Sequence, residues 1–170
     1  KECPEFIGKT TIHINCLEPV KGLWVEYVGK SVDQLLIDGD SQKINWDGKR
    51  IELPSLTVGS HIIEVQFRSE VTNRGVGIHH YNDPENQTDY YYSNLCPYDA
   101  SRIFPCFDQP DLKARFELSV DLPSKWIAIA NSSQVEELVN GQKKYVKFAS
   151  TPPISSYLFA LCFGDYKKVK

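Results

Sequence analysis

Polar and apolar residues alternate with a period of two along three stretches of the chain. The longest alternation covers residues 113–121, and residues 11–16 and 61–69 show the same period. This period is typical of β-strands that bury one face and expose the other. The residues predicted to face inward are Ile12, Ile14, Cys16, Ile63, Val65, Phe67, Ala114, Phe116, Leu118 and Val120.

Other short runs are apolar at nearly every position. Residues 126–130 (WIAIA) and 157–163 (YLFALCF) are too short for core helices and predict strands covered on both faces. Further strands are expected within residues 23–28, 35–37 and 90–92, all rich in β-branched, aromatic or other large apolar residues.

Turn residues punctuate these strands at regular intervals. Asp38-Gly39, Asp47-Gly48 and Asn140-Gly141 are dipeptides that suit hairpin turns, because they tolerate positive φ angles. The turn at Asp47-Gly48 is expected to join a strand near Ile44 to residues 50–53. No amphipathic helix of about ten residues is predicted, so the expected fold is all-β, a saddle-like antiparallel β-sandwich.

Residues 90–116 form an unusual aromatic and proline-rich segment. Prolines 97, 105 and 110 fix φ and lack an amide donor, which argues against a helix or a central strand here. The segment is therefore expected to be an ordered, irregular crossing between two strands.

Composition narrows the class of protein. A chain of 170 residues with 41% hydrophobic content predicts one domain over residues 1–170. A net charge of −3 without a long basic run argues against nucleic acid or a membrane as the main partner. Five cysteines without a CxxC pair favour reduced thiols, and no signal peptide is recognised. A soluble, cytoplasmic chain is therefore expected, although the sequence has glycosylation sequons at Asn86 and Asn131.

Candidate catalytic and metal-binding residues are weak. The sequence has no GxSxG, GxGxxG, phosphate-binding loop or HExxH. His61 and Glu64 would point to opposite faces of a strand, and adjacent His79 and His80 would diverge in the same way, so neither pair predicts a metal site. Two further acidic side chains, Asp108 and Asp111, are expected to cap the turn before the next strand, and Arg102 is expected to pair with a carboxylate or with backbone carbonyls.

One string is specific to a known family. Residues 99–114 (DASRIFPCFDQPDLKA) closely resemble the "DAR…FPCFDEPDLKA" motif of the zinc aminopeptidases related to aminopeptidase N and the leukotriene hydrolase. Residues 6–8 (FIG), 77–84 and 151–158 (TPPISSYL) are similar to flanking motifs of the same family, so the resemblance spans nearly the whole chain.

The resemblance implies the amino-terminal β-saddle domain of such an enzyme. The family's zinc lies in a following thermolysin-like domain that carries HExxH and a GxMEN loop, and this sequence contains neither. The chain is therefore expected to hold no zinc and no catalytic residue. It would cap the active-site cleft of a metallo-aminopeptidase, with that catalytic domain and the amino terminus of a peptide substrate as partners.

One departure from the family concerns substrate binding. Before Pro-Tyr-Asp-Ala the family usually has Q-x-E or Q-x-Q, whose last residue holds the α-amine of the substrate. Here Asn94, Leu95 and Cys96 occupy these positions, so Asn94 and Cys96 are the predicted substrate-binding residues. A charged acceptor for an ammonium contributes about 1.5 to 3 kcal/mol and a thiol is a weak acceptor, so amine recognition should weaken roughly tenfold to a hundredfold.

Two other interpretations stay open. The chain could belong to a family member that has lost catalysis and serves as a noncatalytic binding or scaffold module, which the replacement at Cys96 would fit. It could also be a free-standing β-sandwich that binds an unrelated partner. The presence of HExxH in the full-length gene would separate the first interpretation from an active parent.

Overall fold

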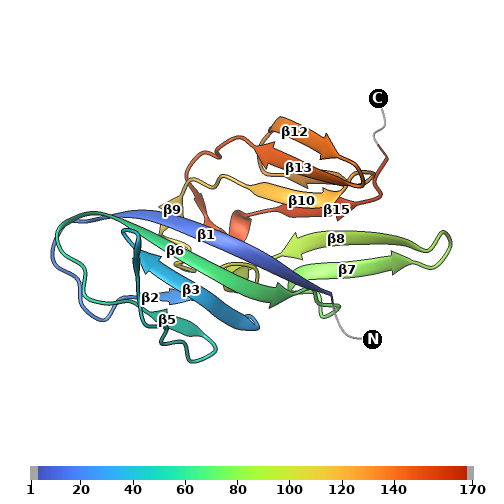
Figure 1. The fold of residues 1–170 in the computed structure, drawn as a ribbon. Coiled ribbons are helices and arrows are strands. Elements are labelled where there is room, and N and C mark those ends of the chain that lie inside the picture. Colours follow the sequence, from blue (N-terminus) through green and yellow to red (C-terminus); the bar gives the residue numbers. More distant parts are fainter. Residues whose placement is uncertain (1–3, 168–170) are drawn as a thin grey trace. The chain divides into compact units, whose positions relative to one another are not determined.

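Nearly all regular structure in the computed structural model, which describes residues 4–167, is β-strand. The strands are β1 (Glu5–Cys16), β2 (Trp24–Glu26), β3 (Ser31–Ile37), β4 (Asp40–Ser41), β5 (Arg50–Glu52), β6 (Gly59–Glu70), β7 (Gly77–Asp83), β8 (Thr88–Asn94), β9 (Lys113–Ala114), β10 (Ser119–Pro123), β11 (Ile127–Ala130), β12 (Gln134–Asn140), β13 (Lys143–Phe148), β14 (Ile154–Ser155) and β15 (Leu161–Gly164) (Figure 1). Two short 3-10 helices, η1 (Ala100–Arg102) and η2 (Ser156–Leu158), complete the described elements. The ladders between these strands are antiparallel, so the predicted all-β class is confirmed.

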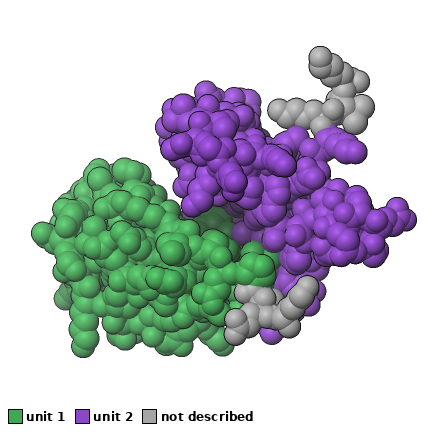
Figure 2. Space-filling view, turned by 45° about the vertical axis from the view of Figure 1, so that its right-hand side comes forward, with its two compact units in different colours: residues 1–71, 98–108 green, residues 72–97, 109–170 purple. Residues whose placement is uncertain are grey.

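The described residues divide into two compact units (Figure 2). Unit 1 comprises residues 4–71 and 98–108, and unit 2 comprises residues 72–97 and 109–167. The chain therefore leaves unit 1 after residue 71, returns to it for residues 98–108 in the middle of the crossing, and then completes unit 2. The single domain expected over residues 1–170 stays a prediction.

Unit 1 is built on a four-stranded sheet in the order β1-β6-β3-β4, with β2 and β5 as a separate pair. In Figure 1 the long blue and green strands β1 and β6 run side by side, in a register that pairs Glu5 with Glu70 and Cys16 with Gly59. The alternation predicted in β6 is confirmed, because Ile63, Val65 and Phe67 are all buried. The buried core of unit 1 consists of Cys16, Val25, Tyr27, Leu35, Ile37, Ile51, Leu53, Leu56, Ile63, Val65 and Phe67.

The hairpin dipeptides of unit 1 behave differently from one another. Asp38 and Gly39 both have positive φ, of 53° and 88°, and they join β3 to β4 as predicted. At Asp47-Gly48 the turn also forms, because the Asp47 carboxylate accepts hydrogen bonds from the amides two and three residues later. Residues 42–45 form no strand, however, and Trp46 pairs with Ile51 in an isolated bridge.

Unit 2 contains a three-stranded sheet, β10-β13-β12, and a four-stranded sheet, β11-β15-β8-β7, with β9 and β14 as a short pair. Its core contains Leu122, Ala128, Val146 and Phe148 from β10, β11 and β13, with Trp126 and Phe163 packed against them. Tyr91 of β8 stacks on Phe163 at a centroid distance of 4.7 Å, which extends the apolar layer across the larger sheet.

The strand predicted over residues 113–121 is wrong in its middle. β9 ends at Ala114 and β10 begins at Ser119, and between them backbone and side-chain bonds to Thr151 and Phe148 form no continuous ladder. The Arg115 guanidinium donates to the Thr151 carbonyl at 3.1 Å, and the Phe116 amide donates to the Thr151 hydroxyl at 3.0 Å. Ala114 is exposed rather than inward, since β9 pairs only with the two-residue β14.

The apolar run 157–163 is also interrupted. It begins in η2, and its strand starts only at Leu161. The Asn131 carboxamide holds the break open by donating to the Leu158 carbonyl at 2.8 Å and accepting from the Ala160 amide at 2.6 Å. Leu158 is consequently exposed, and Ile129 in the other apolar run is 53% exposed, so neither run is covered on both faces within the described residues.

Candidate functional site

The crossing is fixed most firmly between Ala100 and Asp108. Ala100 and Ser101 are buried in η1, and Ile103, Pro105 and Cys106 are buried after it. The amides of Ile103 and Phe104 both donate to the Ala100 carbonyl, at 2.9 and 3.1 Å. The segment is irregular, as the prolines predict, and its apolar side chains are anchored.

Hydrogen bonds attach the crossing to β2, to the residues that follow β2, and to β6 within unit 1. Glu26 and Cys106 exchange two backbone bonds, with the Glu26 amide donating at 2.9 Å and the Cys106 amide at 3.1 Å. The Val28 amide donates to the Ser101 carbonyl at 2.8 Å, and the hydroxyl of Ser69 donates to the Arg102 carbonyl at 2.9 Å. The crossing is thus positioned by two strands that are themselves part of the core.

Asp108 bonds to η1, which precedes it in the sequence. Its carboxylate accepts the Ser101 amide at 3.0 Å, and its own amide donates to the Glu26 carboxylate at 3.3 Å. The predicted capping of the next turn by Asp108 stays a prediction. Asp111 is exposed, and the structure does not pair the two carboxylates.

The ionisable groups inside the crossing have structural partners. Arg102 forms an ion pair with Asp99, so of the two kinds of partner predicted for it the structure shows the carboxylate. Burial, together with the negative charges of Asp108 and Glu26, raises the pKa of the Cys106 thiol well above its usual value. Cys106 is therefore an inert buried thiol, because the thiolate is the reactive form.

The two predicted substrate-binding residues lie where β8 ends. Asn94 is its last residue, and the Asn94 Nδ2 donates to the Gly75 carbonyl at 2.6 Å. Leu95 is buried and Cys96 is exposed, so the backbone is anchored immediately before the thiol. Cys96 precedes Pro97 through a cis peptide bond. Their role in substrate binding stays a prediction.

The sequence was compared with known proteins. The family described as "Peptidase M1 N-terminal domain" matches residues 2–158. The chain belongs to this family. It is 35% identical over 162 residues to aminopeptidase N of Streptomyces lividans, a match that covers 94% of this chain and 18% of that protein.

Other relatives of this M1 domain carry similar names. Aminopeptidase M1-A of Oryza sativa subsp. japonica is 33% identical over 117 residues, covering 68% of this chain and 13% of that protein. Aminopeptidase N of Acetobacter pasteurianus is 27% identical over 176 residues, covering 98% of this chain and 50% of that protein. The chain therefore spans between about an eighth and a half of the length of these relatives.

His79 and His80, which are adjacent in β7 of the M1 domain, contact different partners. His79 packs against Tyr92 at a centroid distance of 4.9 Å, whereas His80 stacks on Tyr91 at 4.8 Å and bonds to Asp89. Neighbouring residues of a strand face opposite ways, so the predicted divergence of the two rings is confirmed. Across residues 4–167, no three His, Cys, Asp or Glu side chains are grouped so that they could hold a metal ion.

Sequence reasoning missed the network that supports Asn94. Thr72 donates through its hydroxyl to the Val76 carbonyl at 2.8 Å, and the Gly75 amide donates to His79 Nδ1 at 3.1 Å. These bonds shape the bend before β7, which presents the Gly75 carbonyl to Asn94. Gly75 and Gly77 both have positive φ in this bend, but no local pattern in the sequence indicates its partner. Among the described residues, no helix has the length and hydropathy needed to cross a membrane.

Proposed function

We propose that this M1 domain is the noncatalytic amino-terminal part of a longer zinc aminopeptidase that removes amino-terminal residues from peptides. The observation that carries the proposal is the family match over residues 2–158, combined with relatives named aminopeptidases that are much longer than the matched segment. In this proposal zinc and the catalytic residues belong to the catalytic domain of the same parent chain.

The domain's own contribution would be to cap the active-site cleft and to help bind the substrate's amino terminus. Asn94 and Cys96 are the residues proposed to meet that amine. Their positions support this role, because the Asn94–Gly75 bond and the buried Leu95 fix the backbone that presents an exposed thiol. A neutral thiol accepts a hydrogen bond from an ammonium only weakly, so the parent would recognise the amine less strongly than a relative with a carboxylate there.

Kinetics of the full-length parent test the role of Cys96. Cys96→Glu restores a charged acceptor, so KM for small aminoacyl substrates with a free α-amine should fall by about tenfold or more. Cys96→Ser is the matched control, because it keeps a small neutral group and should leave KM nearly unchanged. An unchanged KM in the glutamate variant would remove Cys96 from the amine site. A parent without HExxH and without peptidase activity would instead refute the enzyme assignment.

One face of the larger sheet of unit 2 is the surface proposed to bind the catalytic domain. Directly opposed residues of neighbouring strands share a face, and register places Ile129, Cys162, Tyr92 and His79 in one row across β11, β15, β8 and β7. We define the aromatic face as Ile127, Ile129, Cys162, His79, Tyr81, Tyr90 and Tyr92.

This aromatic face is apolar but incompletely covered. Ile129 is 53% exposed, Tyr81 49% and Tyr92 39%, while the other face of the same sheet carries the buried Tyr91 and Ala128. An exposed group of large apolar side chains on a sheet marks an interaction surface. The length of the relatives makes the remainder of the parent chain the partner proposed here.

Binding between separately expressed parts of the parent would test this surface. Burying one isoleucine side chain contributes about 1.5 to 3 kcal/mol, so Ile129→Asp in the 170-residue chain should weaken its complex with the remainder of the parent at least tenfold in Kd. Val139→Asp is the matched control, since Val139 is 61% exposed on β12 of the smaller sheet. Equal effects of the two substitutions, measured by calorimetry, would exclude the aromatic face as the docking surface.

A further inference from the structure

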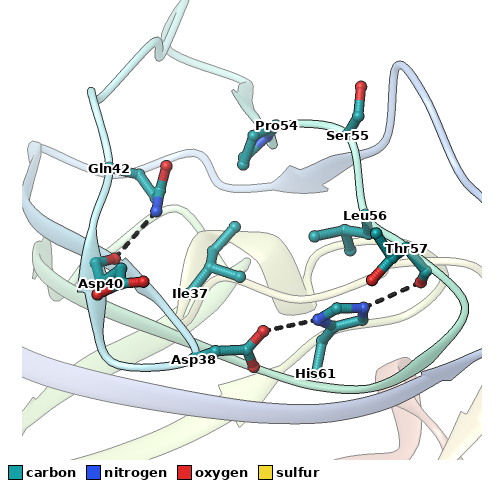
Figure 3. Close-up of a pocket in the computed structure, with 9 residues that line it drawn as sticks. All are labelled: Ile37, Asp38, Asp40, Gln42, Pro54, Ser55, Leu56, Thr57 and His61. Atoms are coloured by element: carbon teal, nitrogen blue, oxygen red, sulfur yellow. Dashed lines mark hydrogen bonds and ion pairs between the residues drawn. The ribbon is translucent and has the colours of Figure 1, made fainter.

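A hollow of about 280 Å³ lies within unit 1, beside the turn between β3 and β4. The hairpin residues Asp38 and Asp40 line one side, and the segment that contains Ser55 and Thr57 lines the other (Figure 3). His61 lies between these two sides at the start of β6, with its ring pointing to both. This histidine belongs neither to the crossing nor to the aromatic face.

The His61 ring is held at both nitrogens by hydrogen-bond acceptors. Nδ1 lies 2.7 Å from the Asp38 carboxylate and Nε2 lies 3.0 Å from the Thr57 carbonyl, and the side chain is only 11% exposed. A neutral imidazole carries one N–H, whereas the imidazolium carries two. Since a carboxylate and a carbonyl can only accept, both contacts are hydrogen bonds only when His61 is protonated.

The Asp38 end of this arrangement is the more rigid one. Asp38 has a φ of 53°, and its second carboxylate oxygen accepts the Ile62 amide at 2.8 Å. Hydrogen bonds from His61 and from the Ile62 amide lower the pKa of Asp38. Its carboxylate is therefore charged and fixed in place wherever the protein is near neutral pH.

The Thr57 end belongs to a short segment between two anchored residues. Leu56 is buried and exchanges two 2.9 Å backbone bonds with Val20, while Gly59 is paired with Cys16 at the start of β6. Between these two fixed points lie Thr57 and Val58, and Val58 is 60% exposed. The hydrogen bond from His61 Nε2 to the Thr57 carbonyl therefore restrains a short segment that is already anchored at both ends.

We propose that His61 is a proton-dependent clamp between the Asp38 turn and the Thr57 carbonyl. Loss of one proton leaves Nδ1–H donating to Asp38, the shorter and charge-assisted bond, and turns the lone pair of Nε2 toward the Thr57 oxygen. Two facing acceptors repel each other, so the Thr57–Val58 peptide group moves away from the ring.

The direction of the pH dependence follows from the surroundings of His61. The Asp38 hydrogen bond, and then the bond to the Thr57 carbonyl, raise the pKa of His61 above its ordinary value of 6.5. Both His61 bonds are therefore present below pH 6.5, and the bond to Thr57 is lost as the pH rises through the raised pKa of His61. The pKa of Asp38 is lowered from its ordinary value of 3.8, so its carboxylate stays charged throughout this range. The other charged group lining the hollow is Asp40, and the β1 residue opposite His61 is the apolar Ile14.

NMR titration of the 170-residue chain tests the clamp directly. The backbone amide of Val58 shares its peptide group with the Thr57 carbonyl, so its chemical shift should titrate with the same midpoint as the His61 ring. His61→Gln should abolish that response, because glutamine does not titrate. A Val58 amide that keeps a constant shift through the His61 transition would overturn the proposal in the unaltered protein, whatever the variants do.

Two carboxylate variants separate the specific bond from general charge. Asp38→Asn suits the positive φ of the turn and removes the charge, so the His61 midpoint should fall towards that of an unpaired histidine. Asp40→Asn is the matched control in the same hollow and should change the midpoint much less. Equal shifts in the two variants would show that the local charge, and not the Asp38 bond, sets the titration of His61.

Discussion

Replacement of Asp108 tests how the crossing is held. Asp108 is 9% exposed and Ser101 is 6% exposed, so the 3.0 Å bond between the Asp108 carboxylate and the Ser101 amide is shielded from water. This bond joins two residues that are seven positions apart in the sequence. We expect it to contribute more to stability than any bond of the nearby exposed Asp111. We compare Asp108→Asn, Asp108→Ala and Asp111→Asn.

The magnitudes follow from the kind of bond that each variant leaves. A hydrogen bond to a charged group contributes about 1.5 to 3 kcal/mol and a neutral one about 0.5 to 1.5 kcal/mol. Asp108→Asn keeps an acceptor of the same shape, so the free energy of unfolding should fall by about 1 kcal/mol. Asp108→Ala leaves the buried Ser101 amide without this acceptor, so the fall should be about 2 to 3 kcal/mol.

Urea unfolding followed by circular dichroism measures these differences. Asp108→Ala should lower the free energy of unfolding more than Asp108→Asn does, and Asp111→Asn should stay within about 0.5 kcal/mol of the unaltered chain. The slope of the transition should stay constant, which shows that the variants change stability and not the surface exposed on unfolding. An Asp108→Ala variant as stable as Asp111→Asn would refute the assignment of Asp108 to η1.

Two further predictions concern packing. A Cβ at Gly8 would overlap the ring of Phe67, its cross-strand partner. Gly8→Ala should therefore lower the free energy of unfolding in urea by about 1 to 3 kcal/mol, and by less than half as much in a Phe67→Leu background. Equal losses in both backgrounds would contradict a clash with that ring. Lys144 is 8% exposed, and its Nζ lies 3.3 Å from the carboxylate of the more exposed Glu137. Lys144→Met should therefore change the free energy of unfolding by less than about 1 kcal/mol. Glu137→Gln should lower it by more, because it leaves a buried ammonium without its carboxylate partner. If thermal unfolding shows that Lys144→Met loses more stability than Glu137→Gln, the cost of desolvating the lysine does not decide the contribution of this ion pair.

The strands that could be predicted were those that bury one face of a sheet along their length, because their alternating sequence then matches their burial. In β6 one face rests on the core of unit 1, so alternation in the sequence and burial in the structure coincide at Ile63, Val65 and Phe67. The turn at Asp38-Gly39 was predictable for a similar reason, since positive φ at two successive residues is a local requirement.

The interruptions could not be predicted from local pattern. Thr151 bonds to Arg115 and Phe116 through its hydroxyl and its backbone where a regular ladder was expected, and the Asn131 carboxamide bonds to Leu158 and Ala160. The competing polar group lies between 27 and 36 residues away in the sequence. A period-two pattern contains no information about such a partner, so it predicts a continuous strand.

The candidate site was predicted by motif, and its chemistry was predicted only in part. Residues 99–114 identified the family, and local reasoning gave the ion pair of Arg102. The target of the Asp108 carboxylate was missed, because it depends on how η1 folds back within the crossing. The clamp at His61 was missed as well, since both of its acceptors are set by turn geometry that alternation does not describe.

Burial separates the family motif at residues 99–114, part of which makes the fold, from the exposed residues just before it. Ala100, Ser101, Cys106 and Asp108 are buried and hydrogen-bonded or packed within unit 1, so substitutions there should act on stability. The preceding residues 96–98 are exposed, and Tyr98 is 65% exposed. An exposed segment that follows an anchored Leu95 can change its side chains at little cost in stability, because few buried contacts are lost. The exchange of a carboxylate or amide for a thiol at Cys96 is therefore expected to alter binding of the substrate amine while leaving the domain folded.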